Sequence, residues 1–309
     1  LSNISSISED IINEIIKNKD KFVKTNYIKK KKRWYRKIYM IVNQEYEKLV
    51  KFLNSEFSRL YNFDKCINWF VKWRWIITNA KEHLDKKIII NIDIKDFFES
   101  IEIVQIKKAL SRIKLKDEII DILIDLITIN NVLPTWFSTS PTISNIICFN
   151  LDNDFKEFTK INWYKYTRYW DDITISTDTS NIIKKSKIVD LLEINNFTIN
   201  EKKYKIQKRW WNRYVTWLTV CENNIPRIPK FIKKKLRQEA YYINKYWIES
   251  HIKKIWEVNT LFIYWEKSVY WWSWFLKNLE PKLSEYIIEK YDKQIVIPNK
   301  IQEKLEILK

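Results

Sequence analysis

The sequence contains no glycine, although its 309 residues include sixteen tryptophans. Ordinary usage is roughly 7% glycine, so a chain of this length would have about twenty. Glycine enters turns with φ above zero at no steric cost, so its absence excludes the usual way of building them. Trp210 and Trp211 stand where a turn is expected between two strand-like segments, 205–209 and 214–220. We hypothesise that most or all of the tryptophans stand where the organism reads glycine, as a stop codon reassigned to glycine but translated as tryptophan would cause.

Cysteine and long apolar runs are also scarce. The three cysteines, Cys66, Cys148 and Cys221, are isolated and odd in number, which argues against a disulfide framework or a zinc site. No apolar run reaches membrane-spanning length, since segments such as 119–129 are interrupted by aspartates. The first residues carry serine, glutamate and aspartate in place of the basic and apolar run of a signal peptide. These absences predict a cytoplasmic protein with no membrane partner.

Positive charge and apolar residues, by contrast, are abundant. Lys and Arg number 56 against 38 Asp and Glu, which gives a net charge of +18, and hydrophobic residues make up 46% of the chain. The hydrophobic fraction predicts a globular chain. The charge favours a polyanionic partner, either nucleic acid or an anionic membrane surface. A basic cluster at 29–37 is expected to hold nucleic-acid phosphates, unless it is only a solvated charged face.

Hydrophobic periodicity predicts a mixed order of helices and strands. Strands are predicted at 36–42, 88–94, 164–169 and 173–177, with a hairpin at 205–220, and helices at 103–112, 117–129, 141–158 and 181–194. From Pro229 onward the pattern is helical and basic, and Pro226 and Pro229 bracket the expected domain boundary. This order predicts an α+β core followed by a helical C-terminal lobe.

Three aspartates form the strongest candidate site. Asp93 ends the β-branched segment that begins at residue 88, and Asp171 and Asp172 lie at the tip of the hairpin predicted at 164–177. Adjacent carboxylates repel one another, and a divalent cation would relieve that repulsion. Phosphoryl transfer uses two Mg²⁺ ions about 3.5–4 Å apart, and Mg²⁺ prefers carboxylate oxygens. An Asp-Asp pair alone is usually an ordinary turn, but the earlier strand ending in Asp93 favours a polymerase site with two Mg²⁺ ions.

Three segments around these aspartates resemble motifs of reverse transcriptases. Asp93 with Phe98 is similar to motif A of that family. The segment 169–172, Tyr-Trp-Asp-Asp, is similar to motif C, which is normally Tyr-Ala-Asp-Asp or Tyr-Gly-Asp-Asp. Between them, residues 134–141, Pro-Thr-Trp-Phe-Ser-Thr-Ser-Pro, resemble motif B, which the family writes Pro-Gln-Gly-x-x-x-Ser-Pro. Trp136 therefore falls on a family glycine, and Thr135 replaces the usual glutamine.

Two further segments resemble the diagnostic elements of retron reverse transcriptases, bacterial enzymes that make a branched RNA–DNA from a dedicated non-coding RNA. Residues 79–83, Asn-Ala-Lys-Glu-His, match NAxxH. Residues 215–217, Val-Thr-Trp, match VTG with tryptophan in place of the glycine. The resemblance covers roughly residues 30–280.

The resemblance implies a right-hand polymerase fold, with fingers and palm at 1–227 and a helical thumb at 228–309. It implies RNA-directed DNA synthesis from deoxynucleoside triphosphates, on a structured non-coding RNA that serves as template and primer source and yields a DNA product. It also implies a role in phage defence through an effector protein.

The resemblance further assigns roles to single residues. The implied metal ligands are Asp93, the main chain of Ile94, Asp171 and Asp172. The implied nucleotide contacts are Lys72 and Arg74 at the triphosphate, Phe98 as the gate against a ribose 2′-hydroxyl, and Lys203 (or Lys202) near the leaving pyrophosphate. The implied RNA or template contacts are Asn79, His83, Ser140, Pro141 and Thr216. Ordinary alternatives are a solvated cationic face for Lys72 and Arg74, a core aromatic for Phe98, and a structural histidine for His83.

Two other interpretations stay open. The chain could be a group II intron-like or diversity-generating reverse transcriptase, which a neighbouring structured RNA gene would discriminate. It could also be a polymerase-derived RNA-binding module without catalysis, although the intact Asp93, Asp171 and Asp172 weigh against this.

Overall fold

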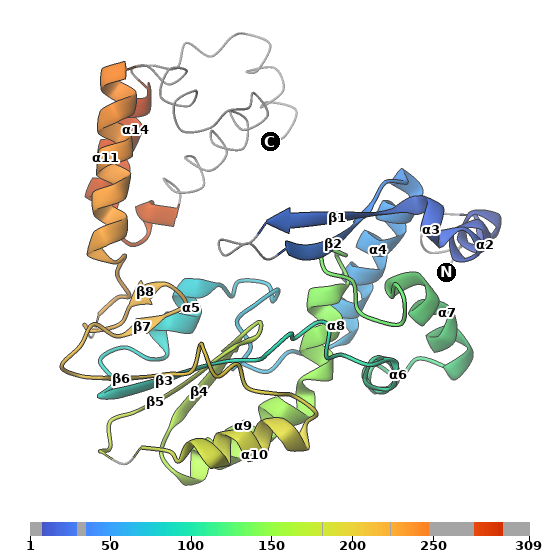
Figure 1. The fold of residues 1–309 in the computed structure, drawn as a ribbon, viewed down its shortest axis with the longest axis horizontal. Coiled ribbons are helices and arrows are strands. Elements are labelled where there is room, and N and C mark those ends of the chain that lie inside the picture. Colours follow the sequence, from blue (N-terminus) through green and yellow to red (C-terminus); the bar gives the residue numbers. More distant parts are fainter. Residues whose placement is uncertain (1–7, 30–34, 181, 223, 247–274, 293–309) are drawn as a thin grey trace. The chain divides into compact units, whose positions relative to one another are not determined.

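The computed structural model describes residues 8–29, 35–180, 182–222, 224–246 and 275–292 (Figure 1). The chain divides into two compact units, Leu1–Thr216 and Trp217–Lys309. The division falls between Thr216 and Trp217, whereas the thumb was predicted to begin at residue 228. Within the described residues, no helix combines the length and the apolar character needed to cross a membrane.

The centre of the first unit is a four-stranded antiparallel sheet in the order β4-β5-β3-β6. Its strands are β4 (Lys165–Tyr169), β5 (Asp172–Thr177), β3 (Ile88–Asp93) and β6 (Lys205–Lys208). The strand β3 is rich in isoleucine because it lies between two neighbours and is almost wholly buried. The register pairs Asp93 of β3 with Asp172 of β5, so the sheet itself brings two of the candidate carboxylates together.

Helices pack around this sheet and complete one hydrophobic core. Figure 1 shows α9 (Phe149–Ile161) and α10 (Lys185–Ile194) side by side along the sheet, where they bury residues such as Phe155 and Leu192. The other helices of the unit are α2 (Glu9–Lys17), α3 (Lys19–Phe22), α4 (Gln44–Leu60), α5 (Ile76–Lys81), α6 (Ile103–Arg112), α7 (Asp117–Ile127) and α8 (Ser140–Ile147). Each buried leucine, isoleucine or phenylalanine contributes roughly 1.5–3 kcal/mol, so this core is the main source of stability.

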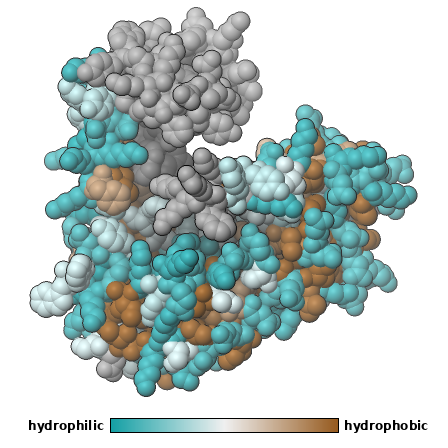
Figure 2. Space-filling view, in the orientation of Figure 1, coloured by the Kyte–Doolittle hydropathy of each residue, from teal (hydrophilic) through white to brown (hydrophobic). Residues whose placement is uncertain are grey.

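A second hairpin in the same unit is formed by β1 (Val23–Lys29) and β2 (Tyr35–Ile41). Tyr27 and Tyr35 expose 64% and 62% of their surface. Most of the predicted basic cluster at 29–37 falls at residues 30–34, which lie outside the described residues. Figure 2 shows that hydrophilic residues cover much of the coloured surface on the face in view, as the high net charge requires.

The last short strand of the first unit is β7 (Tyr214–Val215). The second unit contains β8 (Leu218–Thr219) and two packed helices, α11 (Lys230–Tyr246) and α14 (Pro281–Asp292). Buried apolar residues line this packing: Ala240, Leu276, Leu279, Leu283 and Ile287. The helical character predicted after Pro229 is therefore confirmed for the described part of this unit.

Two predictions about secondary structure were wrong. The helix predicted at 141–158 is two helices, α8 and α9, which meet at Cys148. The hairpin predicted at 205–220 does not form, because β6 pairs with β3 at the edge of the main sheet. Trp210 and Trp211, in the turn after β6, are strongly exposed but are not among the residues with positive φ.

Elsewhere the backbone supports the hypothesis that tryptophan stands at glycine positions. Among the residues that the structure describes, five tryptophans have φ in the left-handed region: Trp73 (67°), Trp136 (86°), Trp163 (59°), Trp170 (64°) and Trp217 (75°). Such a φ is a genuine outlier for a bulky residue and routine for glycine. Trp73 and Trp163 also expose 85% and 86% of their surface, where an indole gains little from burial. The backbone at these five positions therefore has a conformation that glycine adopts easily and tryptophan does not.

Candidate active site

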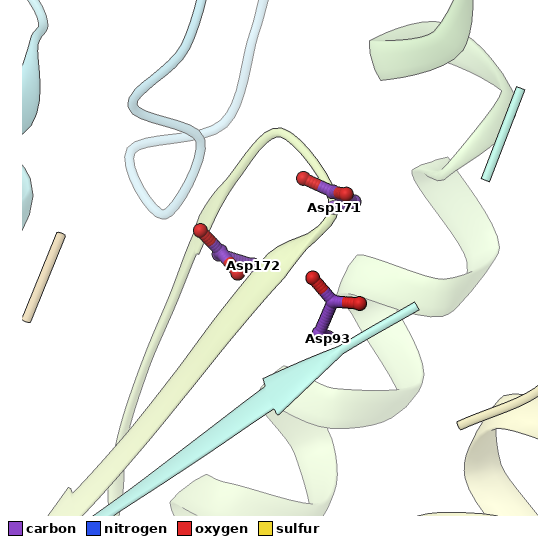
Figure 3. Close-up of side chains that lie close together, drawn as sticks. All are labelled: Asp93, Asp171 and Asp172. Atoms are coloured by element: carbon purple, nitrogen blue, oxygen red, sulfur yellow. The ribbon is translucent and has the colours of Figure 1, made fainter. Parts of the chain in front are cut away.

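The three predicted aspartates converge at one end of the sheet. Asp93 ends β3, Asp171 lies in the turn between β4 and β5, and Asp172 begins β5 (Figure 3). One carboxylate oxygen from each residue lies within 4.8 Å of the others. The backbone fixes this approach, because the Ile94 N–H donates to the Asp171 carbonyl at 3.0 Å and Asp93 is paired with Asp172. The side chain of Ile94 is buried, so only its main chain could contribute to a metal site.

The electrostatics of the cluster call for a cation. Burial, followed by the neighbouring charges of Asp171 and Asp93, raises the pKa of Asp172 to about 7, while Lys203 opposes the shift. Three carboxylates this close cannot all ionise comfortably without added positive charge. Hard oxygen donors are also the ligands that Mg²⁺ and similar ions prefer. The residues present therefore fit a divalent metal.

Lys203 and Asn200 both donate hydrogen bonds to the Asp93 carboxylate. The Lys203 ammonium donates to Asp93 Oδ1 at 2.5 Å, and Asn200 Nδ2 donates to Asp93 Oδ2 at 2.9 Å. Burial opposes protonation of Lys203, but the hydrogen bond and charge of Asp93 outweigh it and raise the pKa of the lysine. Lys203 therefore lies at the carboxylate cluster as a cation, and its place near a leaving pyrophosphate stays a prediction.

The turn that carries Asp171 is crowded by aromatic rings. The Trp170 indole stacks on Trp69 with centroids 5.4 Å apart and meets the edge of Phe98 at 5.6 Å. Within the described residues, the indole nitrogens of Trp69 and Trp170 are buried without a hydrogen-bond partner, which costs free energy. A glycine at position 170 would remove both the strained φ and one orphaned donor, and would open the space beside Phe98.

The NAxxH and VTG segments meet inside the protein. Asn79 Nδ2 donates to Thr216 Oγ1 at 3.4 Å, and Thr216 Oγ1 donates to the Ile76 carbonyl at 3.2 Å. His83 contacts both strands of the β4–β5 hairpin, with Nδ1 2.6 Å from Ser176 Oγ on β5 and Nε2 2.7 Å from Thr167 Oγ1 on β4. Burial, followed by the charges of Lys165 and Lys86, lowers the pKa of His83 to about 3, so the imidazole is neutral.

These positions bear on the predicted RNA contacts. The side chains of Asn79 and His83 have no exposed surface, and Thr216 exposes 8%. Asn79, His83 and Thr216 therefore have structural contacts inside the protein, and direct contact of these three residues with RNA stays a prediction.

Comparison with known proteins gives the family. The profile of the reverse transcriptase (RNA-dependent DNA polymerase) family matches residues 28–238, more than half of the chain. The chain belongs to this family. Its relatives include the retron Ec73 reverse transcriptase of Escherichia coli, 33% identical over 223 residues that cover 64% of this chain and 69% of that protein. The family and these relatives confirm the predicted retron-type resemblance and the right-hand polymerase fold class.

Two more retron relatives are less similar. The retron Ec86 reverse transcriptase of Escherichia coli is 27% identical and is aligned over 56% of this chain and 55% of its own length. The retron Mx162 reverse transcriptase of Myxococcus xanthus is 26% identical, and the alignment covers 54% of this chain and 42% of that protein. The chain thus spans about half the length of these two relatives. Among solved structures, Candida albicans telomerase with a fragment of telomeric RNA has a TM-score of 0.44 at 11% identity, with 94% of this chain and 63% of that chain covered.

Motif B of this reverse transcriptase begins helix α8. Ser140 is buried and its Oγ donates to the Pro134 carbonyl at 2.6 Å, and Pro141 occupies the first turn of the helix, where a proline is tolerated. Ser140 therefore shapes the loop before α8, and contact of Ser140 and Pro141 with a template stays a prediction. Trp136, on the family glycine, exposes 62% of its surface and has a φ of 86°.

The two predicted triphosphate cations differ in surroundings. The Arg74 guanidinium donates to main-chain carbonyls of Phe63, Asp64 and Ile67, so it ties down the preceding loop. Lys72 is exposed, with its ammonium 5.5 Å from the centre of the Trp73 ring. Arg74 thus contacts the main chain while Lys72 is exposed, and contact of either residue with a triphosphate stays a prediction.

Several site residues were missed by sequence reasoning. Arg168, two residues before the turn, is fully buried and pairs with Asp152 of α9 and Asn145 of α8. Asn200, which holds Asp93, was also missed. A signal existed for the pair, since Asp152 stands beside Leu151 and three residues before Phe155 on an amphipathic helix, and Arg168 stands between Thr167 and Tyr169 in a strand predicted to be in the core. A charge at a core position usually has a buried partner.

Proposed function

We propose that this protein is a retron-type RNA-directed DNA polymerase that copies a structured non-coding RNA into DNA. The observation that carries the proposal is the cluster of Asp93, Asp171 and Asp172 in a chain of the reverse transcriptase family. The same proposal includes the deoxynucleoside triphosphates as substrates and an RNA that is both template and primer source. A role in phage defence with an effector protein, in the cytoplasm, rests on the retron resemblance alone.

The chemistry would follow from what each side chain is placed to do. Asp93, Asp171 and Asp172 would hold two Mg²⁺ ions, which when bound activate the primer 3′-hydroxyl and stabilise charge on the triphosphate. Lys203, protonated beside Asp93, would offer positive charge to the leaving pyrophosphate. Phe98, at the edge of the catalytic turn, would lie under the sugar and exclude a 2′-hydroxyl. Lys72 would meet the triphosphate from the 69–75 loop.

Nucleic acid that copurifies with the protein tests the proposal. Sequencing should recover one structured RNA together with DNA complementary to part of it. The Asp171→Asn protein should retain the RNA and lack the DNA, because RNA affinity comes from many dispersed phosphate contacts and not from the carboxylates. An intron RNA would favour the group II intron-like alternative. RNA without DNA from the unmodified protein would favour a catalytically silent RNA-binding module.

A further inference from the structure

The guanidinium of Arg168 is a buried charge that contacts the catalytic turn. Arg168 lies on β4 with no exposed surface. Its Nε donates to Asp152 Oδ1 and its Nη2 to Asp152 Oδ2, both at 2.8 Å, so the pair is a two-point ion pair. Burial opposes the charge on Arg168, but Asp152 outweighs it and raises the pKa of the arginine well above its usual range. The charged form of Arg168 is therefore fixed inside the core.

The remaining guanidinium nitrogen joins the turn to motif B. Arg168 Nη1 donates to the Trp170 carbonyl and to Asn145 Oδ1, each at 3.0 Å. Position 170 immediately precedes Asp171, and Asn145 is on α8. Asn145 is itself held, because its Nδ2 donates to the Trp69 carbonyl at 2.8 Å. One side chain thus connects α9, α8 and the backbone of the catalytic turn.

The strand that carries Arg168 is held at its main chain as well. The Arg168 N–H donates to the Cys66 carbonyl, and its carbonyl accepts from the Asn68 N–H, both at 2.9 Å. Tyr166, two residues earlier on β4, donates its hydroxyl to Asp152 Oδ1 at 2.6 Å. Arg168 is therefore anchored firmly enough for its Nη1 contact to fix the position of the Trp170 carbonyl.

We infer that Arg168 and Asn145 are positioning residues that set the Asp171 carboxylate for metal binding and link this setting to helix α8. The inference rests on the proposed function for the catalytic role of the metal, whereas the contacts of Arg168 and Asn145 do not depend on that function. Groups behind metal ligands act by orienting them, and their loss typically lowers metal affinity or activity about 10–100-fold. Arg168 and Asn145 occupy that place behind Asp171.

The test measures divalent-metal affinity directly, by calorimetric titration of Mn²⁺ into the folded protein without nucleic acid. Replacing Arg168 by Met together with Asp152 by Asn removes both charges, so no unpaired charge is left buried. This double variant should bind Mn²⁺ about 10–100-fold more weakly than the unmodified protein. Asn145→Ala leaves the ion pair intact and removes one guanidinium partner, so it should fold and show a smaller shift in the same direction. Tyr166→Phe is the matched control, since it deletes a hydrogen bond to Asp152 from the same strand and should leave Mn²⁺ affinity unchanged.

The outcomes separate the alternatives. An Mn²⁺ affinity within about twofold of the unmodified protein, in Asn145→Ala and in the folded double variant, would overturn the positioning role. An equal loss of Mn²⁺ affinity in Tyr166→Phe would also overturn it, because the loss would then reflect a general destabilisation of the core. Weaker Mn²⁺ binding in the double variant and in Asn145→Ala, but not in Tyr166→Phe, supports the inference. This result holds even if the protein extends no primer, so the metal titration and the test of the proposed function can fail independently.

Discussion

The β1–β2 and β4–β5 hairpins of the first unit are both antiparallel, but the first exposes many of its side chains and the second buries most of them. In β1–β2, Tyr27 and Tyr35 face solvent with more than half of their surface exposed, and Lys37 lies opposite Tyr27. In β4–β5, the strands are buried and their polar side chains are hydrogen-bonded to His83 and Asp152. A metal site needs carboxylates held to fractions of an ångström, whereas contact with a flexible polyanion needs exposed cations and rings. The two hairpins fit these two tasks.

The largest expected effect concerns the tryptophans with positive φ. A bulky residue held there costs roughly 1–3 kcal/mol, and five such positions together would approach a typical stability of about 5–15 kcal/mol. We expect the tryptophan-containing chain to express poorly or to be inactive. The chain with glycine at all sixteen tryptophan positions should be soluble and should polymerise DNA. Expression and activity of two synthetic genes decide this, and equal behaviour would reject the hypothesis.

Mass spectrometry of the protein from its own organism tests the same hypothesis independently. Peptides that contain positions 136 and 217 should have the masses of glycine. Tryptophan masses at both positions would show that the substitutions are native and tolerated.

The second expected effect concerns the base of the β4–β5 hairpin. The unfolded His83 has a pKa of about 6.5, and burial lowers the folded pKa to about 3. Above pH 6.5 His83 is neutral in both the folded and the unfolded protein, so its full contribution to the free energy of unfolding is present. Between pH 6.5 and 3 only the unfolded state binds it, and the free energy of unfolding falls by up to roughly 1.4 kcal/mol per pH unit. Urea unfolding at pH 7, 6, 5 and 4 should show a steeper decline than in His83→Gln, and parallel curves would exclude this role.

A smaller effect is expected from Phe98→Ala, which opens the space beside the catalytic turn. Removing the ring should relax discrimination against ribonucleotides by at least about tenfold, because a 2′-hydroxyl could then be accommodated. Competitive incorporation of deoxy- and ribonucleotides measures the ratio. Phe97→Ala, on the adjacent buried ring, is the control and should destabilise the protein without changing the ratio. An unchanged ratio in Phe98→Ala would leave Phe98 as a core residue.

The smallest effect is expected on the β1–β2 hairpin. Replacing Tyr27 and Lys37 by alanine should weaken RNA binding by about 5–50-fold through lost stacking and one lost phosphate contact. The unfolding transition should stay in place, since both side chains are exposed. Filter binding at several salt concentrations and thermal unfolding test the two halves of this expectation. A shifted unfolding transition with unchanged RNA affinity would show that these β1–β2 side chains contribute to stability and not to RNA binding.

Local patterns predicted what depends on local physics. The isoleucine-rich segment ending in Asp93, the helix at 103–112 and the turn with Asp171 and Asp172 lie where the pattern placed them, because period and burial determine them. The partner of β6 could not be read from the sequence, since a short polar strand near another strand predicts a hairpin equally well. The break at Cys148 was missed because apolar spacing continues across it.

In the site, residue types predicted the carboxylates but not what holds them. Nothing in the spacing indicates that His83 would reach Thr167 and Ser176, or that Arg168 would reach the Trp170 carbonyl. Such contacts join segments far apart in the chain, so they depend on the three-dimensional packing. The burial of His83 is likewise a tertiary property, and for this reason the sequence left its role open.

Primer extension on an RNA template tests the central claim most directly. Purified protein, in the tryptophan or glycine version that folds, is given a primed RNA, deoxynucleoside triphosphates and Mg²⁺. Extension should occur and should fall by at least about 100-fold in Asp171→Asn, since a metal ligand matters at least as much as the groups behind it. Asp178→Asn, at the far end of β5 where the carboxylate pairs with Lys86 on the surface, should retain full activity. Extension by Asp171→Asn at the rate of the unmodified protein would contradict the assignment of the catalytic site.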